Sequence, residues 1–102
     1  MLFDNGSLDA TLAAAAGDDP SLLGELRGAF VESVARQLDL LKRARCDGNW
    51  IVAAMRLKGL AASFHAEELI VLADEALASA PGDPVILRRI EAFLNAFVAR
   101  GT

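Results

Sequence analysis

Apolar residues recur at intervals of three and four positions along most of the chain, which is the spacing of one face of an α-helix. Between residues 19 and 46 they form a single stripe of Leu23, Leu26, Phe30, Val34, Leu38 and Leu41. Asp19 and Pro20 begin this segment as a capping residue and a first-turn proline, whose missing N–H costs nothing there. The pattern therefore predicts a helix over residues 19–46.

A shorter, alanine-rich helix is predicted before the long one, over about residues 7–16. The segment reads SLDATLAAAAG, in which Ser7 is expected to cap the first turn and Gly17 to end the helix. No segment alternates apolar and polar residues between hairpin turns, so no β-sheet is expected.

Three further helices are predicted in the second half of the chain, and turn residues mark their ends. They are expected over about residues 50–64, 66–79 and 83–100. Asp47-Gly48-Asn49 predicts a turn before the first, residues 80–84 (APGDP) break the chain, and Asp83 is expected to cap the last helix. Helices joined by short loops pack as antiparallel neighbours. The expected fold is therefore all-α, an antiparallel up-down four-helix bundle with a short N-terminal helix.

Length and composition fit one domain, residues 1–102, which can bury a core without disulfides or metals. The residues are 54% hydrophobic and 24% charged, which excludes global disorder. The net charge of −4 comes without a basic stripe, so nucleic acid is not an expected partner. Lys42, Arg43 and Arg45 do cluster, but at the end of a predicted helix, where cations complement the helix dipole.

Membrane, disulfide and metal chemistry find no support in the sequence. No stretch approaches the roughly 20 apolar residues that span a bilayer, and the first residues do not read as a signal peptide. Cys46 is the only cysteine and His65 the only histidine, which excludes a disulfide within the chain and a structural zinc site. We expect a cytoplasmic protein that needs no cofactor and no membrane.

The predicted helix over residues 50–64 has two unlike faces when successive residues are placed about 100° apart around its axis. The core face consists of Trp50, Ala54, Leu57, Ala61 and Phe64, flanked by Ala53 and Leu60. The outer face consists of Met55 at its centre, then Ile51, Val52, Lys58, Gly59 and Ala62, then Arg56 and Ser63. Apolar residues beside charges on an exposed face are typical of a contact surface, and a mid-helix glycine suits close approach of another molecule. Burial of this strip by the N-terminal helix or by a second copy is the alternative.

Residues 55–69, MRLKGLAASFHAEEL, resemble the signature helix of histidine-containing phosphotransfer (HPt) domains, His-x-Leu-Lys-Gly-x-x-x-x-x-Gly-Ala-x-x-Leu. The resemblance extends to the opening DDPSLL (18–23), to FVE (30–32) and to DGNW (47–50), and covers about residues 8–98. It implies a four-helix bundle of a two-component phosphorelay, with a response-regulator receiver domain or a histidine kinase as its partner.

Met55 stands where the family carries its phosphorylated histidine, and His65 stands at the second glycine of the motif. A thioether is not basic enough to accept and hold a phosphoryl group, so phosphotransfer at Met55 is excluded. By resemblance, Lys58 would neutralise a phosphate or the acidic pocket of a receiver, and Gly59 would let a partner come close. In an unbroken helix His65 would lie about 15 Å along the axis from Met55 and about 80° around it, and it falls at a predicted helix boundary.

The sequence supports three hypotheses for function. The first is a non-phosphorylatable HPt-like module whose docking surface is Ile51, Met55, Arg56, Lys58, Gly59 and Ala62. The second is a structural or homo-oligomeric bundle, monomeric or weakly dimeric, without a signalling partner. The third is active phosphotransfer through His65. No Ser/His/Asp set, phosphate-binding glycine loop or dinucleotide motif is present, so the chain is not expected to be an enzyme.

Overall fold

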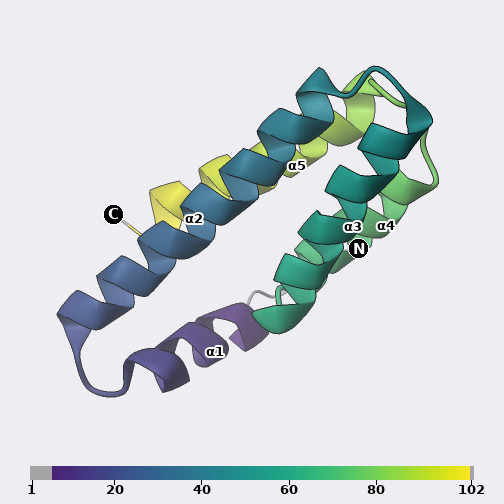
Figure 1. Cartoon of the computed structure of the whole chain (residues 1–102). Coiled ribbons are helices and arrows are strands. Elements are labelled where there is room, and N and C mark those ends of the chain that lie inside the picture. Colours follow the sequence, from purple (N-terminus) through teal and green to yellow (C-terminus); the bar gives the residue numbers. More distant parts are fainter. Residues whose placement is uncertain (1–5, 102) are drawn as a thin grey trace.

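The computed structural model describes residues 6–101, and this part of the chain forms five α-helices and no β-strand (Figure 1). They are α1 (Gly6–Ala16), α2 (Pro20–Arg43), α3 (Asp47–Ser63), α4 (Glu67–Leu77) and α5 (Pro84–Arg100). The all-α fold class predicted from the sequence is confirmed.

Two of the predicted helix caps are confirmed by their hydrogen bonds. The Asp19 carboxylate accepts from the backbone N–H groups of Ser21 and Leu22, at 3.0 and 3.2 Å. Asp83 accepts in the same way from the N–H of Val85, at 2.9 Å. Each aspartate thus satisfies donors that the first turn of a helix leaves without a partner.

The predicted turn at Asp47-Gly48-Asn49 is wrong, because these residues form the first turn of α3. The chain instead breaks earlier, where α2 ends at Arg43 and the buried Ala44 takes an extended conformation. The first N–H groups of a helix need no intrahelical partner, and an acidic residue such as Asp47 is favourable beside them. Turn-forming residues therefore fit the start of a helix as well as a loop.

The remaining helix ends lie close to their predicted positions. Ser7 lies inside the first turn of α1 instead of before it, so its expected capping role is not borne out. Gly17 does end α1, with the positive φ of 64° that glycine adopts at little cost. α3 ends at Ser63, one residue before its predicted end. α4 covers Glu67–Leu77 and ends two residues before its predicted end.

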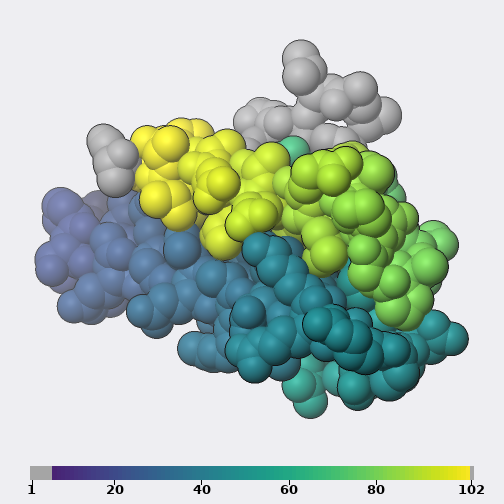
Figure 2. All heavy atoms as spheres, turned by 90° about the horizontal axis from the view of Figure 1, so that it is seen from above, coloured from purple at the N-terminus to yellow at the C-terminus, as the bar shows by residue number. Residues whose placement is uncertain are grey.

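The helices enclose one hydrophobic core. α2 packs against α3 and α5, α4 packs against the same two helices, and α1 packs against α2. In Figure 2 the yellow-green α5 and the teal α3 both lie beside the blue α2. The connections α2–α3 and α4–α5 lie at one end of the molecule, and α1 lies at the other end beside the α3–α4 connection (Figure 1).

The apolar stripes predicted from the sequence supply this core. The buried residues of α2 to α5 are Phe30, Val34, Leu38 and Leu41; Trp50, Ala53, Ala54, Leu57 and Ala61; Leu69, Leu72, Ala73 and Ala76; and Ile86, Ile90, Phe93 and Phe97. Leu23 and Leu26, at the start of the α2 stripe, are only partly buried against them. The stripe assignments are therefore confirmed, with weaker burial where α2 begins.

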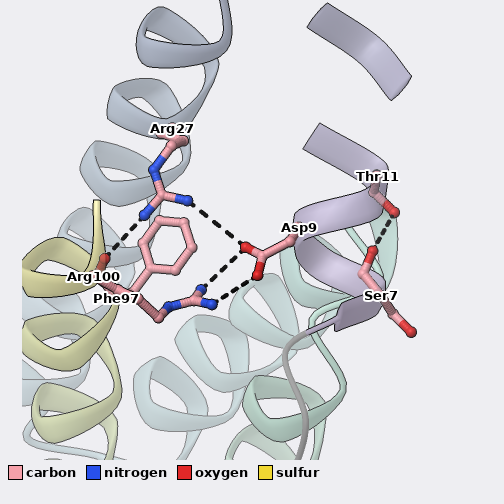
Figure 3. Close-up of polar contacts among 6 residues, drawn as sticks. All are labelled: Ser7, Asp9, Thr11, Arg27, Phe97 and Arg100. Carbon is pink, nitrogen blue, oxygen red and sulfur yellow. Dashed lines mark hydrogen bonds and ion pairs between the residues drawn. The ribbon is translucent and has the colours of Figure 1, made fainter. Parts of the chain in front are cut away.

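Helix α1 is held at its end of the molecule by apolar and charged contacts. Its Leu8 and Leu12 are fully buried. Its Asp9 bonds to Arg100 at 2.7 and 3.2 Å and lies 3.7 Å from the guanidinium of Arg27. Both guanidinium groups lie over the ring of Phe97, as Figure 3 shows. One carboxylate of α1 thus joins α2 to α5.

Candidate functional site

The two predicted faces of α3 are present in the structure. Its core-facing residues are buried, with Trp50 and Leu57 at most 1% exposed, although Phe64 and Leu60 are only partly buried. The outer face of α3 is exposed, and we use this name for Ile51, Val52, Met55, Arg56, Lys58, Gly59 and Ala62. α1 packs against α2 at the end of the molecule where α3 ends, and the residues of this face stay exposed.

Large apolar side chains are concentrated on this face. Ile51, Val52 and Met55 are 42%, 48% and 59% exposed. They are half of the six large apolar residues that are exposed in the described chain, and Met55 is the most exposed of all. The other three, Leu40, Val85 and Val98, lie on α2 and α5. The concentration marks the outer face of α3 as a candidate contact surface.

Lys58 borders this face on the side of α4. Its ammonium group lies 2.8 Å from the carboxylate of Asp74, while 46% of its side chain stays exposed. An exposed ion pair of this kind contributes little to stability, so Lys58 remains available to a competing anionic group.

Gly59 has no packing reason to be glycine within the described chain. A Cβ built at this position would meet no atom within 4 Å. Its carbonyl accepts a hydrogen bond from the hydroxyl of Ser63 at 2.9 Å. Glycine weakens a helix interior, so its presence on an open face is consistent with close approach of a second molecule.

A groove borders the face on the side of α2. It has a volume of about 480 Å³ and is lined by Leu40, Arg43, Ala44, Asn49, Val52, Ala53 and Arg56. Sequence reasoning placed Arg56 and Val52 on the outer face but missed the groove. The available signal was Leu40, an apolar residue off the inward stripe of α2.

Arg43, at the rim of this groove, is bound by its own helix. Its guanidinium donates to the carboxylate of Asp39, one turn earlier in α2. This hydrogen bond and the charge of Asp39 raise the pKa of Arg43 above its ordinary value. Arg43 is therefore a fixed cation whose charge is already partly compensated.

His65 lies apart from the outer face of α3, in the connection to α4. Its φ of 55° is in the left-handed region, where glycine is usual. The N–H of His65 bonds to the carbonyl of Ala62, and the N–H of Ala66 bonds to that of Ala61 at 2.8 Å. These two bonds form a Schellman motif with His65 at its left-handed position. The predicted helix boundary at His65 is confirmed, so the extrapolation of an unbroken helix does not apply.

The imidazole of His65 points to α1. Its Nδ1 lies 2.9 Å from the hydroxyl of Thr11, which is also within hydrogen-bonding distance of the carbonyl of Ser7. The tautomer of His65 decides which of the imidazole and the Thr11 hydroxyl donates to the other. The neighbouring hydroxyl of Ser7 bonds to the carboxylate of Glu67 at 3.4 Å. The charged group of this network is the carboxylate of Glu67, which would repel a bound phosphate.

Neither a cluster of metal-ligating side chains nor a membrane-spanning helix is found in residues 6–101. No group of three or more His, Cys, Asp or Glu side chains is placed to hold a metal ion in this range. None of the five helices has the length and apolar content to cross a membrane. Cys46 is exposed at the position before α3 and makes no capping hydrogen bond.

Known proteins provide no further constraint on this surface. Comparisons of the chain with protein-family models, with curated proteins and with solved structures find no match.

Proposed function

We propose that this chain is an HPt-like signalling module that lacks the phosphoacceptor histidine and acts by binding a receiver domain or a histidine kinase. The observation that carries the proposal is the outer face of α3. Met55 stands at the motif position of the acceptor histidine and is 59% exposed, one turn after the exposed apolar residues Ile51 and Val52. A buried Met55 would have left no surface at this position for a partner.

The packing of the helices supports an antiparallel up-down four-helix bundle with a short additional helix, the architecture that the resemblance implies. α2, α3, α4 and α5 contact one another in a closed ring, and short connections join consecutive members at alternate ends. α1 covers one end of this ring, leaving the outer face of α3 open.

One of the two glycine positions of the HPt motif has a physical reason in this fold. The second motif glycine corresponds to His65, whose backbone takes the left-handed conformation that glycine favours. The first corresponds to Gly59, which faces open space beside Met55. Both positions fit a chain that keeps the motif geometry after losing its reactive side chain.

Loss of the histidine changes the chemistry that the module can perform. The Met55 thioether cannot form a phosphoramidate, so a docked receiver would keep its phosphoryl group. Methionine is flexible and polarisable, which suits contact with a protein surface. The module would therefore act by occupying its partner, without turnover and without a cofactor.

A binding titration tests the proposal, with receiver and histidine-kinase domains from the same genome as partners. We expect Met55→Asp to weaken binding at least about tenfold, equivalent to ~1.4 kcal/mol, because a carboxylate would be desolvated in the contact. Val98→Asp is the matched control, since Val98 is 43% exposed on α5, outside the outer face of α3. The proposal fails if no domain binds, or if both variants bind equally.

Lys58 offers a second probe of the same contact. Lys58→Ala removes the cation, and Asp74→Ala frees it from its present partner at 2.8 Å. If Lys58 meets an acidic group of the partner, the first change weakens binding and the second leaves it unchanged or strengthens it. Equal weakening by both changes would assign the effect to the structure of the bundle.

A homo-oligomeric bundle is the alternative, because the exposed apolar strip that fits a partner could also fit a second copy. Sedimentation at high protein concentration separates the two. A monomer agrees with the docking proposal, whereas a dimer that Met55→Asp dissociates would favour the oligomer.

A further inference from the structure

Charge is distributed very unevenly along this acidic chain. The segment from Leu40 to Ala62 contains five of the ten basic residues and one of the fourteen acidic residues, so it carries a charge of +4. The rest of the chain then carries −8. The basic segment includes the end of α2 and nearly all of α3, which form the two sides of the groove beside the outer face. The groove itself is lined by two arginines, Arg43 and Arg56, and by no acidic residue.

The groove has apolar walls. Leu40 on α2 and Val52 on α3 line it and are 38% and 48% exposed. Ala44 and Ala53, which are buried, lie at its base. Small residues at the base and larger apolar residues at the sides leave room for one inserted apolar side chain.

Arg56 is the cation of this groove that has no acidic partner in the described chain. Arg43 is bonded to Asp39, and Lys42 and Lys58 to Glu91 and Asp74. The side chain of Arg56 makes no hydrogen bond or ion pair with residues 6–101, and the residue is exposed beside Val52. Its planar guanidinium suits two-point binding of a carboxylate.

We infer that this groove binds an acidic amphipathic segment of the partner protein, which inserts one apolar side chain between Leu40 and Val52 and places a carboxylate on Arg56. The inference rests on the proposed function and adds the chemistry of the partner and the side of α3 on which it lies. A phosphate backbone would use the positive charge but would leave the exposed Leu40 and Val52 without contacts, so a protein partner fits the groove better than a nucleic acid.

Synthetic peptides test the groove without a known partner. The probe is an amphipathic helical peptide with leucines on one face and glutamates on the other, and the matched peptide carries lysines for the glutamates. Titration of the full chain, followed by backbone amide NMR, is expected to shift Leu40, Val52 and Arg56 with the glutamate peptide only. Equal shifts with both peptides, no shifts at these residues, or tighter binding of a DNA duplex to the same residues would overturn the inference.

A charge reversal provides the control. Arg56→Glu is expected to weaken binding of the glutamate peptide at least tenfold and to allow the lysine peptide to bind. Arg88→Glu changes the net charge equally, since Arg88 is an exposed arginine of α5 outside the basic segment, and is expected to change binding less than twofold. If both variants weaken binding equally, the long-range charge of the molecule explains the effect and the groove does not.

The same variants separate this inference from the proposed function. A receiver or kinase domain that is weakened by Met55→Asp but not by Arg56→Glu would overturn the groove and leave the docking proposal intact. A groove that binds the glutamate peptide while no such domain binds the chain would leave the groove intact and overturn the docking proposal.

Discussion

At the scale of single residues, the backbone conformation of His65 explains why the HPt motif has a glycine at this position. Its backbone has φ 55°, and its ring is tied to Thr11 of α1. A non-glycine residue in this region costs about 1–2 kcal/mol. One hydrogen bond of an exposed side chain recovers only part of that cost. His65 is therefore a conformationally expensive residue at the end of α3.

Two substitutions of His65 isolate the backbone cost. His65→Gly and His65→Ala both remove the bond to Thr11, but only glycine relaxes the left-handed backbone. The free energy of unfolding of the glycine variant should exceed that of the alanine variant by about 1 kcal/mol. Urea denaturation measures the difference, and equal stabilities would show that the backbone at this position is not strained.

Substitution of Gly59 by alanine is expected to affect the free energy of unfolding and partner binding in opposite directions. Because a Cβ would meet no atom within 4 Å, Gly59→Ala should raise the free energy of unfolding by about 1 kcal/mol through helix propensity. Gly28→Ala, in the equally open interior of α2, should stabilise similarly. Only the change at Gly59 is expected to weaken binding of a receiver domain. Unchanged binding in both variants would contradict close approach at Gly59.

At the scale of helices, α3 is joined to α4 by Trp50. The ring is 1% exposed, and its indole N–H donates to the carbonyl of Ala76 at 2.7 Å. Trp50→Phe keeps an aromatic core residue but loses this bond and part of the packed volume. The free energy of unfolding should fall by about 1–3 kcal/mol, measured by denaturation. A variant as stable as the wild type would show that this contact does not hold the two helices together.

The sequence predicts helices better than it predicts their ends. Each amphipathic stripe identifies the helix and its buried face, because side-chain spacing depends only on helical geometry. The break between α2 and α3 comes at Ala44, which is buried in an extended conformation, and a sequence pattern does not reveal which alanine is buried. The outer face of α3 follows from the same spacing, whereas its groove requires α2 beside it.

At the scale of the whole molecule, α1 belongs to the common core. Leu12 is 1% exposed, so Leu12→Ala should lower the free energy of unfolding by about 2–5 kcal/mol. Asp9→Ala removes only exposed ion pairs with Arg27 and Arg100 and should cost less than about 1 kcal/mol. Both variants should unfold in one transition, followed by circular dichroism. Separate melting of α1 would show that it is an appendage.

The central claim is that the outer face of α3 keeps the docking surface of an HPt domain, although Met55 replaces the phosphoacceptor histidine. The most direct measurement restores the acceptor with Met55→His, next to Lys58 and Gly59, and follows phosphoryl transfer from a phosphorylated receiver domain. Transfer to the variant, with none to the wild type or to Met55→Gln, is the predicted result. A folded Met55→His protein that accepts no phosphoryl group from any receiver that binds it would contradict the claim.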